Sequence, residues 1–234
     1  MELALIKLLS AHVLGDFFLQ PDQWVAEKEE KKLKSGKLYL HVAIHIVLIF
    51  LLFFNFSVFP QALIIGISHL IIDACKLQFQ KPNNKRLWFF ADQLMHLLVI
   101  LAVWLAFTTQ ISVNISFFQN EKLWLYVLGA LFLTSPTAVI IRVAIARFIP
   151  DKNTISLHNA GKFIGILERL LIYIFIITQH FEAVGFLLAA KSIFRFGDLK
   201  EGNELKFTEY VLIGTLLSFG IAIVVSLGIA QINL

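Results

Sequence analysis

The sequence contains little charge and almost no cysteine. Charged residues make up 15% of its 234 residues, whereas soluble globular domains carry roughly 25%. This low charge excludes a soluble globular enzyme, a disordered tail and a coiled coil. The single cysteine excludes a disulfide framework and a cysteine-based zinc cluster. The net charge of +4 requires no nucleic-acid partner, because Lys and Arg collect in the cytoplasmic loops of membrane proteins.

The sequence is rich instead in long apolar segments. Hydrophobic residues make up 58% of the chain, including 23 Phe, and they form continuous runs of roughly 20 residues, the length of a transmembrane helix. A β-barrel would show short alternating segments. We therefore predict an all-helical integral membrane protein with about eight spans. The expected spans are residues 3–19, 38–58, 61–79, 88–109, 123–141, 163–180, 182–196 and 208–230.

The basic residues fall in every second connection between these spans. The basic connections are residues 20–37, 80–87, 142–162 and 196–207, and the other three contain only Lys122. Basic connections lie in the cytoplasm, so both termini are expected outside. Within the first connection, the stretch WVAEKEEKKLKS is either a short helix on the membrane surface or a solvated connector.

The region around residues 110–122 divides the chain into two expected halves of four spans each, residues 1–110 and 111–234. The first span is expected to be retained, because it lacks the basic start and the cleavage site of a signal peptide. The two halves carry different chemistry.

Each of the first four spans contains two potential metal ligands four positions apart. The pairs are His12 and Asp16, His41 and His45, His69 and Asp73, and Asp92 and His96. An i,i+4 spacing places both side chains on one face of a helix. In the predicted topology, every pair lies near the cytoplasmic end of its span. Spacing and topology together therefore bring eight groups to one level of the membrane.

Imidazole and carboxylate groups inside a membrane are costly unless they are paired, solvated or bound to a metal. Five His and three Asp without Cys suit a divalent metal, with zinc favoured and manganese or iron as alternatives. Eight groups exceed the three or four protein ligands of one zinc ion, so we expect one or two ions. A proton relay and hydrogen-bonded core histidines are the alternative interpretations.

The second half carries a set of charges near the cytoplasmic ends of its spans. The expected substrate-binding residues are Arg142, Glu168, Arg169, Lys191 and Arg195. Cations at the depth of a metal cluster suit an anionic small molecule or lipid, such as a phosphate ester or a lipid head group. Extension of each long side chain to the membrane interface is the alternative.

At these residues the chain resembles a known family. The run HVLGDFFLQ (residues 12–20), the later HLIID and DQLMH, and the late ERLLI and AAKSIFRF resemble the bacterial membrane family filed as domain of unknown function 3307. The family has no established activity, and the resemblance implies a multi-pass protein of the cell inner membrane. More distantly, the paired His and Asp are similar to the LexA-regulated membrane-bound metal-dependent hydrolases. That likeness implies metal-assisted hydrolysis as a reaction class.

These features predict an intramembrane metal-dependent hydrolase that acts on an anionic phosphoester or lipid from the cytoplasmic leaflet. The metal would lower the pKa of a bound water, and Asp16 or Asp92 would take its proton. A metal-ion or proton transporter is the alternative, but the outer halves of the first four spans are nearly pure Leu, Ile, Phe and Val. A metal-stabilised subunit or sensor without catalysis is a third alternative. The sequence does not give the oligomeric state.

Reporter fusions test the predicted topology. Fusions at Ser35 and Asn84 should report a cytoplasmic location, because both residues lie in basic connections, and fusions at Asn114 and Leu234 should report an external one. A cytoplasmic C-terminus would show that one expected span is wrong, most directly the short segment 182–196.

Overall fold

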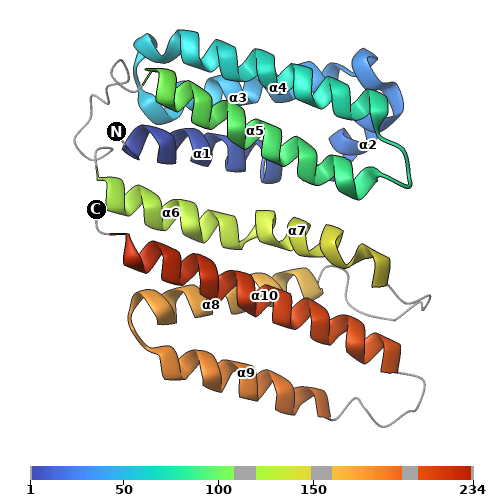
Figure 1. Cartoon of the computed structure of the whole chain (residues 1–234), viewed down its shortest axis with the longest axis vertical. Coiled ribbons are helices and arrows are strands. Elements are labelled where there is room, and N and C mark those ends of the chain that lie inside the picture. The colour runs from blue at the N-terminus through green and yellow to red at the C-terminus, as the bar shows by residue number, and fades with distance from the viewer. Residues whose placement is uncertain (1, 108–119, 149–159, 197–204, 233–234) are drawn as a thin grey trace. The chain divides into compact units, whose positions relative to one another are not determined.

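The computed structural model describes residues 2–107, 120–148, 160–196 and 205–232, and every regular element in these ranges is helical (Figure 1). The prediction of an all-helical chain is therefore confirmed for the described residues. The α-helices are α1 (Glu2–Phe17), α2 (Asp22–Lys31), α3 (Gly36–Phe53), α4 (Phe59–Phe79), α5 (Lys85–Phe107), α6 (Glu121–Leu133), α7 (Ser135–Ile145), α8 (Ala160–Ile177), α9 (Phe181–Phe196) and α10 (Leu205–Gln231). Short 3₁₀ turns are η1 (Lys32–Lys34), η2 (Phe56–Val58) and η4 (Ala146–Phe148).

Several of these helices have the length and apolar composition of membrane spans. Among the described residues, five stretches qualify, and a sixth does if α1 and α2, bent by 78°, count as one span. The five are Gly36–Phe53, Phe56–Phe79, Lys85–Phe107, Glu121–Phe148 and Glu209–Gln231. Helix α8 carries three charged residues and α9 has only 16 residues. The eight-span count and the position of the termini stay predictions.

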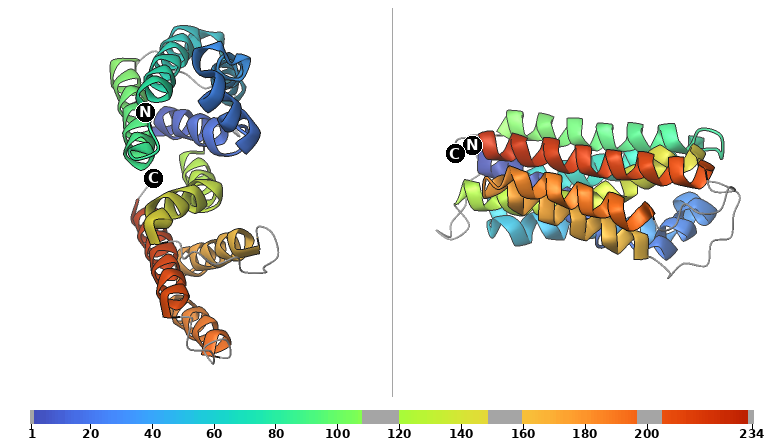
Figure 2. Two further views of the ribbon diagram at one scale, coloured as in Figure 1. Left: turned by 90° about the vertical axis from the view of Figure 1, so that its right-hand side faces the viewer. Right: turned by 90° about the horizontal axis from the view of Figure 1, so that it is seen from below.

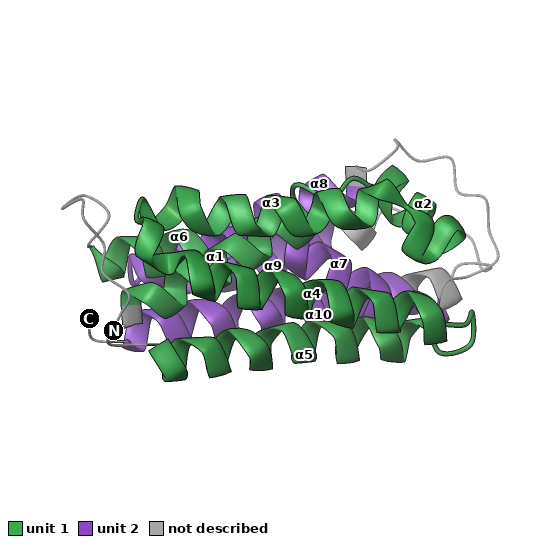
Figure 3. Cartoon of the chain, turned by 90° about the horizontal axis from the view of Figure 1, so that it is seen from above, with its two compact units in different colours: residues 1–128 green, residues 129–234 purple. Residues whose placement is uncertain are grey.

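The chain divides into two compact units (Figure 3). Unit 1 is Met1–Leu128 and unit 2 is Gly129–Leu234, so the division falls within α6. The expected halves are residues 1–110 and 111–234. Their different roles, metal binding in the first and substrate binding in the second, stay a prediction.

Unit 1 is built on a bundle of α1, α3, α4 and α5. Helix α1 packs against α3 and α5, and α4 packs against the same two helices. The four helices thus close a ring, and successive helices of the ring run in opposite directions (Figures 1 and 2). Helix α2 turns away from α1 by 78° and contacts α3. One end of the bundle therefore carries an additional short helix.

Single residues set the helix ends of unit 1. Pro21 directly precedes α2, and Ser35 caps α3 by accepting a hydrogen bond from the Lys37 amide at 3.2 Å. Phe54 ends α3 in a left-handed conformation with φ 48°. Pro60 lies in the first turn of α4, where its missing N–H costs no helical hydrogen bond. These breaks allow the chain to reverse between spans.

The two ends of the bundle differ in chemistry. The end away from α2 is filled by an apolar core that includes Leu8, Phe53, Ile65 and Val103. Lys7 is a buried exception at this end, where its Nζ donates to the Leu52 carbonyl at 2.9 Å. The His and Asp pairs lie on the other side of this core, toward the end of the bundle that carries α2.

In unit 2, α10 packs along α8 and against α7, and α8 also contacts α9. The break between α6 and α7 precedes Pro136, which has no N–H for the carbonyl of Phe132. The Thr137 hydroxyl donates to that carbonyl instead, at 2.7 Å.

Candidate metal centre

The structure brings all eight predicted ligand residues together inside the bundle of unit 1. Each helix of the ring contributes one i,i+4 pair, and none of the eight side chains is more than 9% exposed. The spacing alone explains the shared face, because residues four apart lie one turn apart. The convergence of the four faces is the result of the closed ring.

Asp16 lies at the centre of one part of this cluster. Its Oδ1 atom is 2.9 Å from His45 Nε2, 3.2 Å from His41 Nε2 and 3.4 Å from His69 Nε2. His41 Nε2 and His69 Nε2 are 3.0 Å apart, and His12 Nδ1 lies 3.8 Å from Asp16 Oδ2. We call these five residues the histidine lobe.

The remaining three residues form a second, more acidic part. Asp73, Asp92 and His96 offer ligand atoms that all lie within 4.8 Å of one another, and we call them the carboxylate lobe. The ring of His96 stacks on that of His69, with centroids 3.9 Å apart and an interplanar angle of 19°. The two lobes are therefore one continuous cluster.

Gln93 links the two lobes through its amide group. Its Nε2 donates to Asp16 Oδ2 at 3.0 Å and to Asp92 Oδ2 at 3.2 Å. These bonds fix the second oxygen of Asp16, so that its Oδ1 faces the three imidazoles.

Two lysines enter the carboxylate lobe from outside the eight residues. Lys28 Nζ, from α2, donates to Asp73 Oδ2 at 2.9 Å, and Lys76 Nζ donates to Asp92 Oδ2 at 2.8 Å. The Lys28 side chain is only 7% exposed, which is rare for lysine unless it is paired. Helix α2 is thus tied to the cluster.

Several buried ligand atoms of the cluster lack a hydrogen-bond partner among the described residues. They are His12 Nε2, His41 Nδ1, Asp92 Oδ1 and both ring nitrogens of His96. An unpaired buried polar atom costs about 1–3 kcal/mol. Imidazole nitrogens and carboxylate oxygens are the donors that zinc takes in proteins, so the donor set of the cluster fits a divalent metal such as zinc.

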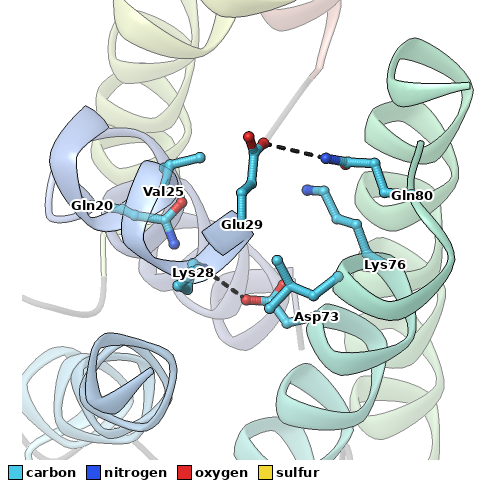
Figure 4. A pocket seen from close by; sticks show the side chains of 8 residues that line it. Gln20, Val25, Lys28, Glu29, Asp73, Lys76 and Gln80 are labelled. Atoms are coloured by element: carbon cyan, nitrogen blue, oxygen red, sulfur yellow. Dashed lines mark hydrogen bonds and ion pairs between the residues drawn. The ribbon is translucent and has the colours of Figure 1, made fainter. Parts of the chain in front are cut away.

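A small cavity reaches the cluster beside Asp73 (Figure 4). It has a volume of about 40 Å³ and is lined by residues of α2 and α4 together with Gln20 and Gln80. Glu29 lies across it from Gln80, which donates to the Glu29 carboxylate at 3.2 Å. Lys85 also pairs with Glu29, at 2.6 Å. The carboxylate lobe is therefore the part of the cluster nearest to this opening.

Three of the residues expected to bind substrate in the second half have partners within unit 2. Glu168 pairs with Lys191. Arg169 donates to the carbonyls of Leu133 and Thr134, at the break between α6 and α7, and to Ser218 Oγ. Arg169 therefore holds the ends of a broken helix.

Arg142 of α7 is exposed. The side chain of Arg195 lies outside the described residues. A cavity shared between these residues and the cluster of unit 1 stays a prediction.

The sequence interpretation missed Lys28, Lys76 and Gln93. Lys76 follows Asp73 by three positions, so helical spacing alone would have placed it on the ligand face. Gln93 lies between the two ligands of its own motif. Lys28 carries no such signal, because it belongs to a run of charges that is typical of a solvated connector.

Gly15, next to Asp16, leaves the space on α1 that the His45 ring occupies. A Cβ atom on Gly15 would lie 2.4 Å from His45 Cε1 and 2.5 Å from its Nε2. Only glycine therefore leaves room for His45 to reach Asp16.

Comparison with known proteins shows that the part of the chain that contains the cluster matches a sequence family. The sequence model of a family described as protein of unknown function (DUF3307) matches residues 4–126, which is more than half of the chain and includes all eight predicted ligand residues. No curated protein and no solved structure matches the chain.

Substitution of Gly15 tests the packing of the cluster. Gly15→Ala should lower the free energy of unfolding by about 1–3 kcal/mol, because the new methyl group overpacks the His45 ring. Gly36→Ala is the control, since a Cβ there meets no atom within 4 Å. Thermal unfolding in one detergent compares the two, and equal stabilities would contradict the close approach.

Proposed function

The chain belongs to the DUF3307 family of proteins of unknown function, and we propose that it is a metal-dependent hydrolase of the membrane. Its divalent ion would bind in the histidine lobe, and its water would face the carboxylate lobe. The substrate would be an anionic phosphoester or lipid.

The observation that carries the proposal is the spacing of ligand atoms around Asp16. In a tetrahedral zinc site with bonds of about 2.0–2.1 Å, ligand atoms lie roughly 3.3 Å apart. Asp16 Oδ1 and the Nε2 atoms of His41, His45 and His69 are separated by 2.9–3.4 Å in the pairs described above. Asp16, His45 and His69 are the central ligands, and both His12 and His41 are near enough to supply the fourth.

The charge of the cluster favours one ion over two. With neutral imidazoles, three aspartates and the two paired lysines leave one negative charge. One divalent ion changes this to one positive charge, which a bound hydroxide or substrate anion would neutralise. Two ions would leave three positive charges, and uncompensated charge is costly inside a membrane.

The two candidate bases now differ in their surroundings. Asp16 Oδ1 is shared by three imidazoles, as a metal ligand would be. Asp92 Oδ2 accepts from Lys76 and Gln93, whereas its buried Oδ1 has no partner among the described residues. A bound metal would lower the pKa of a water molecule. We assign Asp92 Oδ1 as the acceptor of that proton.

The proposed setting is the inner membrane, with eight spans and both termini outside. The end of unit 1 that carries α2 would then face the cytoplasm, because the connection of residues 20–37 is strongly basic. The apolar core at the opposite end argues against transit of ions through the unit.

Metal analysis tests the first part of the proposal. Detergent-purified protein loaded with Zn²⁺ should retain about one ion per chain by mass spectrometry of the metal. Asp16→Asn and His69→Ala should weaken binding at least tenfold, because each removes a central ligand. The control is His180→Ala, which changes an exposed histidine outside the cluster. Full metal retention by Asp16→Asn would contradict the site.

Hydrolysis of p-nitrophenyl phosphate and of its bis ester tests the second part. The metal-loaded protein should hydrolyse at least one ester and lose this activity on chelation. Asp92→Asn should lower kcat by about 10²–10⁴-fold, because it removes a general base, while it keeps most of the metal. Asp22→Asn, at an exposed carboxylate of α2, should leave kcat unchanged. A metal-loaded chain without any esterase activity would favour the metal-stabilised subunit.

A further inference from the structure

Two lysines that the proposed reaction does not use lie between the carboxylate lobe and the surface. Lys28 and Lys76 each bind one oxygen of an aspartate, Asp73 Oδ2 and Asp92 Oδ2 respectively. Both aspartates also lie against His96 of the cluster: Asp73 Oδ1 is 4.0 Å from His96 Nε2, and Asp92 Oδ2 is 4.0 Å from His96 Nδ1. Each carboxylate is therefore shared between an ammonium group and the ligand set.

Both lysines also line the cavity that opens beside Asp73 (Figure 4). They approach it from different helices, Lys28 from α2 and Lys76 from α4. The volume of about 40 Å³ accommodates roughly three water molecules, at ~10–15 Å³ each. The three terminal oxygens of one phosphate group would fill this space.

The charge of the cluster makes anion binding there depend on the metal. Without an ion, the aspartates outnumber the lysines by one, and the cavity repels anions. A divalent ion in the histidine lobe would reverse the sign of this net charge. The two ammonium groups would then be available to an anion at the mouth of the site.

We propose that Lys28 and Lys76 form an anion clamp that holds the phosphate group of a monoester, carried by a soluble molecule or by a lipid head group. This inference rests on the proposed function and names the group that the substrate would present. Two of the cations expected from the sequence, Lys191 and Arg169, bind Glu168 and backbone carbonyls in unit 2 instead. The clamp therefore places substrate recognition in unit 1.

Phosphorus NMR of inorganic phosphate tests the clamp, with the full chain in phosphatidylcholine nanodiscs. Phosphate should bind the Mn²⁺-loaded protein, with broadening of its signal by the nearby ion, and should not bind the metal-free protein. By linkage, phosphate should tighten Mn²⁺ binding by the same factor as Mn²⁺ tightens phosphate binding.

Lysine variants separate the clamp from simple ligation of phosphate by the metal. Lys28→Gln and Lys76→Gln should each weaken phosphate binding about tenfold, because each removes a charge-assisted hydrogen bond, with no loss of Mn²⁺ affinity measured without phosphate. Lys28→Arg should restore most of the binding. Lys85→Gln is the matched control, because Lys85 is exposed and pairs with Glu29 beside the same cavity.

The outcomes distinguish the clamp from the proposed function. Unchanged phosphate affinity in both Gln variants, or no phosphate binding to a protein that holds Mn²⁺, would overturn the clamp alone. A protein that binds no Mn²⁺ would contradict the proposed function itself. If Lys28→Gln does not fold, Lys76→Gln and Lys28→Arg carry the test. Nanodiscs with added phosphatidic acid identify the source of the group, because a lipid phosphate would compete with inorganic phosphate.

Discussion

The carboxylate of Asp16, shared by three imidazoles, is the interaction on which the polar end of unit 1 depends. A buried carboxylate is tolerated inside a membrane protein only where partners compensate its charge, and here the partners come from α3 and α4. Gln93 of α5 holds its second oxygen, and Gly15 of α1 makes room for the His45 ring. All four helices of the ring are therefore bound to one side chain.

In the proposed function, the two lobes of the cluster have different roles. The histidine lobe has the donor set and spacing of a metal-binding site, and it lies behind the carboxylate lobe as seen from the cavity. The carboxylate lobe combines an aspartate oxygen without a partner among the described residues with two lysines that face the cavity. An anionic substrate that enters beside α2 would thus meet positive charge first and the metal next. The proposed roles follow from this order.

Much of the site follows from the sequence, because helical spacing is a local property. The four i,i+4 pairs placed eight candidate ligands on four helix faces, and the alternating basic connections predicted that these faces lie at one level of the membrane. Lys28 could not be found in this way, since its burial results from the turn of α2 back onto α3 and α4. The different surroundings of Asp16 and Asp92 also depend on contacts between helices. Arg169 is a residue type that binds anionic substrates, yet here it binds the carbonyls of Leu133 and Thr134 at the break between α6 and α7.

X-ray absorption spectroscopy of the zinc-loaded protein tests the central claim most directly. The account predicts a first shell of nitrogen and oxygen atoms at about 2.0–2.1 Å, with the multiple-scattering pattern of two or three imidazoles and no sulfur. Asp16→Asn should change this first shell, whereas His180→Ala should leave it intact. A shell of water oxygens without imidazole scattering, or a spectrum that Asp16→Asn does not alter, would contradict the account.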